Sequence, residues 1–194
     1  GDALSPEIFK HFKIKYEVVA NPRLADILCI GSVIRWCNFK DGLTILGSGS
    51  MWNGEKLNPK SNFKFVRGPL TRNNIMLSGG TCPEIYGDPA LLLPLFCSES
   101  KKEHDVGIIP HYVDYVEMKN EFPNFNVIPI LNEDPLVVAK EITKCRAIIS
   151  SSLHGIIAAH AYGIPAAWLK YSNKLDGDGV KFKDHFYSMG LKTH

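Results

Sequence analysis

The sequence predicts an α/β fold with parallel sheets, and two observations carry the prediction. Short apolar runs rich in β-branched residues alternate with helical patterns along the 194 residues, which is typical of parallel strands that are buried on both faces. A stretch of low apolar content at residues 97–105 divides the chain near its middle. We therefore expect two Rossmann-like lobes, residues 1–100 and 101–194, with a cleft between them at the carboxyl ends of the strands.

Each expected element follows from a local pattern. Three helices are expected over residues 69–80, 134–145 and 152–163, because Pro69 suits a first turn, Asp134 can cap a helix and Gly163 can end one. Seven strands are expected from apolar runs between turn residues. They lie within residues 26–32, 43–50, 63–68, 105–111, 125–131, 146–151 and 165–170.

Composition limits the classes of partner. The chain is 45% hydrophobic and 22% charged, as folded proteins are, and its net charge is only +2. No stripe of lysines and arginines is present that could neutralise a nucleic-acid backbone, so nucleic acid is excluded as an expected partner. Five cysteines without close pairing indicate reduced thiols and a cytoplasmic location. No transmembrane segment is expected, because the longest apolar stretch, residues 156–169, is interrupted by polar and turn residues.

The strongest candidate site lies where the strand at residues 146–151 gives way to the next helix. Ser151, Ser152 and His154 would lie at the start of that helix, where free N–H groups and the helix dipole favour an anion. Gly155 would let a ligand or another backbone come close. The alternative is that a serine caps the helix and His154 makes one structural hydrogen bond.

Other strand ends carry weaker signals. Arg67 can bind a carboxylate or phosphate through its planar fork, or it can form a structural ion pair. The loop of Gly47, Ser48 and Gly49 could present amides to an anion or a sugar hydroxyl, although a tight turn explains it equally well. His111 lies just beyond another strand, with a capping or surface role as its alternative.

Two further observations complete the set of candidates. Asp88 precedes Pro89 and is interpreted first as a helix cap, although it could also face the cleft. No HExxH motif and no paired-cysteine spacing occurs, so no metal site is expected.

Taken in order, seven segments of the chain resemble the polysaccharide pyruvyl transferase family. They are GDALSP, LGSGS, VRGPLTR, YGDPALLLP, GIIPHYVDY, SSSLHGIIAAHAYGIPAAWL and KLDGDGVKFKDHFYSMG. The resemblance implies a two-lobed, GT-B-like fold without a cofactor. It also implies phosphoenolpyruvate as the donor and a hydroxyl pair of a glycan, or of its lipid-linked precursor, as the acceptor. The product would be a pyruvate ketal made during cell-surface or exopolysaccharide biosynthesis, and association with the inner face of the membrane is left open.

The family motifs assign roles to particular residues. The arginine of the RGP motif falls on Arg67, and the LHG motif falls on Leu153, His154 and Gly155, all of which would contact the donor. Some members carry an arginine where this chain has Ser152. Lys181 could replace that cation, with an exposed, solvated lysine as its alternative.

The same chemistry can be argued from the residues themselves. Ketal formation protonates the enol methylene, adds two hydroxyls and expels phosphate, so it needs positioned proton donors and acceptors. His154 is the first candidate for general acid or phosphate ligand, and His111 is the second histidine. A nucleotide-sugar glycosyltransferase and a non-catalytic glycan-binding protein remain as alternative functions.

Overall fold

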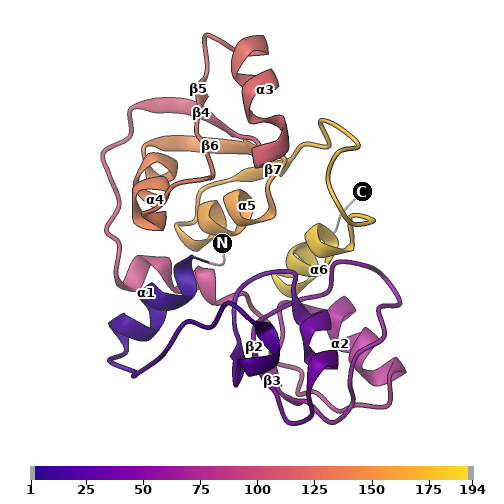
Figure 1. Ribbon diagram of the computed structural model, residues 1–194. Coiled ribbons are helices and arrows are strands. Elements are labelled where there is room, and N and C mark those ends of the chain that lie inside the picture. The colour runs from indigo at the N-terminus through magenta and orange to yellow at the C-terminus, as the bar shows by residue number, and fades with distance from the viewer. Residues whose placement is uncertain (1–2, 192–194) are drawn as a thin grey trace. The chain divides into compact units, whose positions relative to one another are not determined.

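The computed structural model describes residues 3–191, so Gly1 and Asp2 of the GDALSP motif lie outside the described residues. The chain divides into two compact units (Figure 1). The first runs to Pro89 and takes in the chain again from Asp176 onward, and the second is Ala90–Leu175. The expected lobes, 1–100 and 101–194, differ from these units mainly at the C-terminal end. That end belongs to the first unit because its helix, Val180–Ser188, packs on the helix Pro69–Leu77 of that unit and forms an ion pair with the buried Arg67.

The first unit contains a three-stranded sheet in which all strands are parallel, in the order β1-β2-β3. Its strands are β1 (Ile27–Leu28), β2 (Thr44–Leu46) and β3 (Asn62–Phe65), and its helices are α1 (Leu4–His11), α2 (Pro69–Leu77) and α6 (Val180–Ser188). Two short 3-10 helices flank β1 in the chain: Pro22–Leu24 precedes it and Ile34–Phe39 follows it. A buried apolar cluster that includes Ile34, Ile45 and Ile75 forms the core of this unit.

The second unit contains a four-stranded parallel sheet in the order β5-β4-β6-β7. Its strands are β4 (His104–Ile109), β5 (Asn126–Val127), β6 (Cys145–Ser150) and β7 (Ala166–Trp168), and its helices are α3 (Tyr115–Glu121), α4 (Pro135–Thr143) and α5 (Leu153–Ala161). Two 3-10 helices lie in the chain at Pro89–Leu95 and Tyr112–Asp114. Figure 1 shows α4 and α5 together on the sheet and α3 set apart from them.

Register brings three strand ends together at one edge of this sheet. Ile109 of β4 lies beside Ser150 of β6, and Ser150 lies beside Trp168 of β7. Because all four strands are parallel, the loops that follow β4, β6 and β7 emerge at the same edge. The candidate residues of this unit lie in the loops after β4 and β6 and in the first turn of α5.

Most of the expected elements are confirmed. Each of the seven expected strands overlaps an observed one, and all pair in parallel. Asp134 caps α4, its carboxylate accepting the Leu136 N–H at 2.8 Å, and Gly163 follows α5 with φ +65°. The two-lobed, GT-B-like arrangement and its cleft remain predictions. The sequence patterns missed α1, α3 and α6.

The five cysteines, all within the described residues, are free thiols. Among residues 3–191, no helix has the length and apolar character needed to cross a membrane.

Candidate functional site

The turn from β6 into α5 presents three consecutive serines at the edge of the second unit's sheet. Ser150 and Ser151 are fully buried and Ser152 nearly so. The Ser150 hydroxyl accepts the Ser152 N–H at 3.0 Å and lies 2.8 Å from the Ile109 carbonyl oxygen. Ser150 therefore fixes the turn that leads into the helix.

The serines do not cap α5 in the expected way. Ser152 occupies the N-cap position, but its side chain makes no capping hydrogen bond. The Ser151 hydroxyl instead accepts the backbone N–H of His111 at 2.8 Å. Capping by Ser151 or Ser152 is therefore wrong as an explanation of these residues.

Leu153 and His154 open the helix. Leu153 is buried and packs into the core of the unit, whereas His154 in the same turn is half-buried. This is the position that the sequence predicted for the histidine. A half-buried imidazole beside helix N–H groups can donate to an anion or transfer a proton.

Gly155 makes a close approach possible, and the partner is the protein itself. A Cβ on Gly155 would lie 2.6 Å from the Ser150 hydroxyl and 2.9 Å from Cγ2 of Ile109. Its backbone is in ordinary helical conformation, so the requirement is steric. Gly155 lets the start of α5 sit directly on the ends of β4 and β6.

His111 joins this edge from the loop after β4. It is half-buried and precedes the short helix Tyr112–Asp114, and its ring contacts that of Tyr112 at a tilt of 35°, with centroids 4.4 Å apart. Its backbone bond to Ser151 ties the two loops together. The structure thus brings His111, Ser151 and the start of α5 to one sheet edge, as the sequence predicted for parallel strands.

Arg67 in the first unit has a different environment. Its side chain is completely buried just after β3. Its guanidinium donates from Nη1 to the Ser32 hydroxyl at 2.6 Å, from Nη2 to the Ser50 carbonyl oxygen at 2.7 Å, and from Nε to Asp184 at 3.2 Å. The structural ion pair, which was the alternative explanation, is therefore present.

Asp184 of α6 is the partner that the sequence patterns missed. Its Oδ1 accepts the N–H groups of Leu70 and Thr71 at 2.8 and 3.0 Å, and its Oδ2 accepts the Thr71 hydroxyl at 2.6 Å. A residue far along the chain thus caps the N-terminus of α2, whose own N-cap residue, Gly68, has no side chain. No local pattern could reveal this bond, because Arg67 and Asp184 are 117 positions apart.

The Gly47–Gly49 loop is closed around Arg67. All three residues are buried, the Ser48 hydroxyl donates to the Gly31 carbonyl oxygen at 2.9 Å, and the N–H of Gly49 donates to the same oxygen at 3.0 Å. A Cβ on Gly49 would lie 2.3 Å from the Arg67 guanidinium carbon, and one on Gly47 would lie 2.3 Å from the Pro89 ring. In this structure the loop is a tight packing turn, and its role toward an acceptor stays a prediction.

Lys181 and Asp88 are also buried in the first unit. Lys181 is 7% exposed, so the alternative of a solvated lysine is wrong. Its ammonium donates to the Asp176 carbonyl oxygen at 3.1 Å, and burial together with the charge of Arg67 lowers the pKa of Lys181. Asp88 is 2% exposed; burial, aided by the charge of Asp88, raises the pKa of the Cys29 thiol to about 11.

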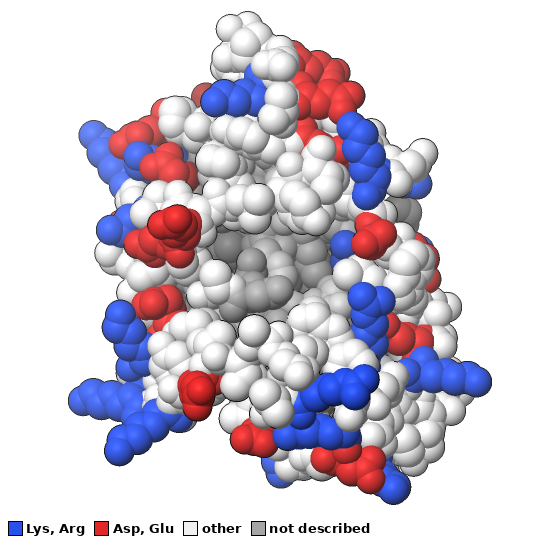
Figure 2. All heavy atoms as spheres, viewed as in Figure 1, with Lys and Arg blue, Asp and Glu red and all other residues white. Residues whose placement is uncertain are grey.

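Two observations concern the class of ligand: the metal-ligating side chains and the charges on the surface. Among the described residues, no group of three or more His, Cys, Asp or Glu side chains could hold a metal ion. On the face shown in Figure 2, lysines and arginines alternate with acidic residues and form no continuous basic band.

The fold and the site together define an α/β protein with parallel sheets that carries histidines and a serine-rich helix start at a strand edge. A family model described as polysaccharide pyruvyl transferase matches residues 27–173. The chain belongs to this family. An uncharacterized protein of Acanthamoeba polyphaga mimivirus is 31% identical over 173 residues, which cover 84% of this chain and 60% of the viral protein. No solved structure matches the chain.

Proposed function

We propose that the protein transfers the enolpyruvyl group of phosphoenolpyruvate to two hydroxyls of a glycan sugar and forms a pyruvate ketal. Family membership supports a transferase that acts on polysaccharides. The observation that carries the finer proposal is the edge where His111, Ser151 and the first turn of α5 meet. An acceptor that is a glycan or its lipid-linked precursor, and a cytoplasmic location, belong to the same proposal.

The reaction makes defined demands on this edge. A proton adds to the methylene carbon of the donor, and one sugar hydroxyl adds to C2 and loses its proton. The C2–O bond to phosphate then breaks with its electron pair on phosphate. The second hydroxyl adds to C2 and also loses its proton. The site must therefore bind a carboxylate and a phosphate, supply one proton and accept two.

The residues of the second unit fit these demands. The N–H groups at the start of α5 suit an anion, and the N-cap residue Ser152 makes no side-chain capping bond there. His154 in that turn is proposed to protonate the methylene carbon or to bind phosphate. His111, half-buried at the same edge, is proposed to accept a hydroxyl proton. Ser151 and Ser152 are proposed to add hydrogen bonds to the donor, with Leu153 and Gly155 shaping the turn.

Arg67 and Lys181 are proposed as donor cations in the first unit, on the resemblance of the RGP motif and on the charge of the buried lysine. Arg67 already has three protein partners in this structure. Its proposed contact with the donor would therefore use the remaining donor capacity of the guanidinium or a rearranged loop. Ser48 and Asp88 remain proposed for the acceptor side.

The test is incubation of the purified protein with phosphoenolpyruvate and a panel of candidate glycans. Phosphate release and a pyruvyl mass added to the glycan are followed together. The proposal expects both in equal amounts, and it expects His154→Gln to lose both.

The same panel separates the alternatives. Calorimetry with nucleotide sugars in place of phosphoenolpyruvate tests for a glycosyltransferase, and glycan binding that survives loss of both Arg67 and His154 indicates a non-catalytic binding protein. Binding of a nucleotide sugar without binding of phosphoenolpyruvate would overturn the proposal.

A further inference from the structure

The chain that follows β7 is fastened to α3 by three separate contacts. We call residues Tyr171–Lys174 the strap. The Tyr171 hydroxyl donates to Glu121 at 2.6 Å, the Ser172 hydroxyl donates to Asp114 at 2.7 Å, and the Lys174 ammonium lies 2.6 Å from Glu117. Each contact uses a different residue of the strap, so the contacts fix its whole length.

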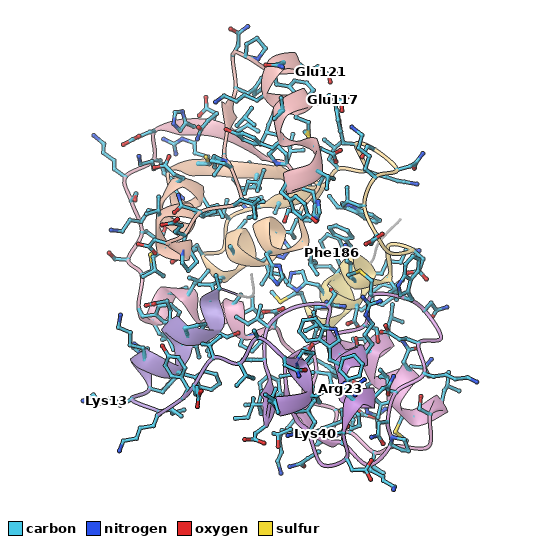
Figure 3. All side chains as sticks on the ribbon, in the orientation of Figure 1. Lys13, Arg23, Lys40, Glu117, Glu121 and Phe186 are labelled. Atoms are coloured by element: carbon cyan, nitrogen blue, oxygen red, sulfur yellow. The ribbon has the colours of Figure 1, made fainter. Side chains whose placement is uncertain are left out.

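The three acidic partners form one stripe of α3. Asp114 is the N-cap of the helix, and Glu117 and Glu121 follow at positions i+3 and i+7, which lie on the same face. Figure 3 shows Glu117 and Glu121 on this helix, and acidic side chains gather over it in Figure 2. The strap therefore binds along a continuous line rather than at one point.

Topology places the strap beside the candidate site. α3 follows β4 and the strap follows β7, and these two strands flank β6 in the sheet. A contact between the loops after β4 and β7 therefore closes around the carboxyl end of β6. Ser151 lies at that end and is itself bonded to the loop after β4.

Asp114 differs from its two neighbours in the stripe. It is fully buried, whereas the Glu117 side chain is 57% exposed. Its Oδ1 accepts Ser172, and Lys174 lies 4.0 Å away, but Oδ2 has no hydrogen-bond partner among the described residues. A buried carboxylate with an unused oxygen is a costly way to stabilise a fold. Its place in the chain calls for another reason.

We propose that Asp114 is a positioning residue that holds the strap against the carboxyl end of β6, and that the held strap keeps water from the reacting carbon of the donor. The inference rests on the proposed function. Water that reached C2 of the protonated donor would add there and lose a proton. The bond to phosphate would then break, and loss of the second water proton would give pyruvate and phosphate in place of a ketal.

The experiment compares Asp114→Ala, Asp114→Asn and Ser172→Ala with the wild type. The control is Glu141→Gln, which also removes the acidic partner of a lysine. Glu141 lies 2.9 Å from the Lys144 ammonium, and this pair precedes the amino end of β6. Hydrogen exchange of the amides of residues 171–174 reports the strap itself. The ratio of phosphate released to ketal formed reports water exclusion.

Asp114→Ala and Ser172→Ala are expected to speed exchange in the strap and to raise the ratio of phosphate to ketal several-fold, with pyruvate as the added product. Asp114→Asn keeps an acceptor for Ser172 and is expected to restore much of the wild-type ratio. Glu141→Gln is expected to change neither readout. Ser172→Ala keeps Asp114 in place, so it tests the strap even where Asp114→Ala folds poorly.

Faster exchange with an unchanged ratio would overturn the role in water exclusion, and unchanged exchange would overturn the role of Asp114 in holding the strap. A wild type that forms no ketal would overturn the proposed function and, with it, water exclusion. The exchange measurement would still decide whether Asp114 holds the strap.

Discussion

The two units use polar residues at strand ends in opposite ways. In the first unit, Arg67 is completely buried, and it binds Ser32, the Ser50 backbone and Asp184. In the second unit, His111 and His154 are half-buried beside the start of α5, where the N-cap residue Ser152 makes no side-chain capping bond. The first arrangement holds its own loops together, whereas the second leaves two half-buried imidazoles at a sheet edge.

The difference teaches how to interpret a polar residue after an apolar strand. Such a residue marks the place where a ligand can bind, but a long side chain can also turn inward and join loops that are distant in sequence. In the first unit the inward network continues through Thr71, Ser50 and Asn74, with hydrogen bonds of 2.9 and 3.0 Å. Burial of the charged group decides between the two roles, and the sequence alone does not give it.

The largest effect is expected at the second unit's edge, from His154→Gln. Glutamine can imitate a hydrogen bond but cannot transfer a proton near neutral pH. If His154 is the general acid, single-turnover ketal formation at saturating phosphoenolpyruvate should fall by about 10²–10⁴-fold. If it binds phosphate only, donor affinity should fall more than the chemical step.

A melting curve of the same variant is the control. His154 is half-buried, so the melting temperature should stay close to that of the wild type. Near-normal turnover would exclude the proton-transfer role, and a collapse of the melting temperature would make His154 a structural residue like Arg67.

The next effect is expected in the first unit, from Asp184→Ala. Removing this carboxylate leaves Arg67 as a buried charge without its ion-pair partner and leaves two N–H groups of α2 without their acceptor. Loss of one member of a buried pair costs about 3–5 kcal/mol of unfolding free energy. Urea unfolding of the variant and of the wild type measures this loss of unfolding free energy.

Arg67→Lys sharpens the same comparison. Lysine keeps the charge but cannot make the three directed bonds of the guanidinium. A donor affinity that falls by about 1.5–3 kcal/mol in Arg67→Lys, but not in Asp184→Ala, would show that Arg67 binds the donor. A donor affinity equal to that of the wild type in both variants, together with a lower free energy of unfolding in both, would show that Arg67 only holds the fold.

Local patterns predicted the strands, their parallel pairing and the start of α4, because apolar runs and a capping aspartate act over a few positions. Asp134 and Gly163 illustrate this, since their roles depend only on neighbours in the chain. His111 and Ser151 could be placed together because parallel strands end at one edge.

The rest depends on contacts between distant segments. Asp184 caps α2 from α6, and Asp114 binds Ser172 across 58 positions. Lys181 carries a charge that predicts exposure, yet its surroundings bury it. The one signal that could have pointed to Asp114 is its place three residues after His111 in the same loop.

A smaller effect is expected from Gly155→Ala. The added methyl would lie within 3 Å of Ser150 and Ile109, so the start of α5 must shift or the strand ends must give way. Overpacking of this kind costs about 1–3 kcal/mol. Denaturant unfolding measures that loss, and a reduced affinity for phosphoenolpyruvate would show that the position of the helix start matters for the site. A variant as stable as the wild type would contradict the tight packing of Gly155.

The smallest effect is expected from Lys181→Met and is read from its pH dependence. Burial and the nearby charge of Arg67 lower the pKa of Lys181 in the folded protein below its ordinary value of 10.5. The unfolded chain therefore binds more protons than the folded one between the folded pKa and 10.5, so the contribution of Lys181 to stability rises with pH across that window. Below the folded pKa, the cost of burying the charge is fully present, and removing the ammonium should leave stability unchanged or slightly raised.

Urea unfolding of the wild type and of Lys181→Met, at neutral pH and at about pH 10, measures the difference in unfolding free energy between the two proteins. Other alkaline titrations, such as that of Cys29, cancel in this difference. The wild type should gain relative to Lys181→Met as the pH rises. A difference that does not change with pH would mean that the lysine is compensated in the folded state, and the first unit would then hold its two buried cations, Arg67 and Lys181, without strain.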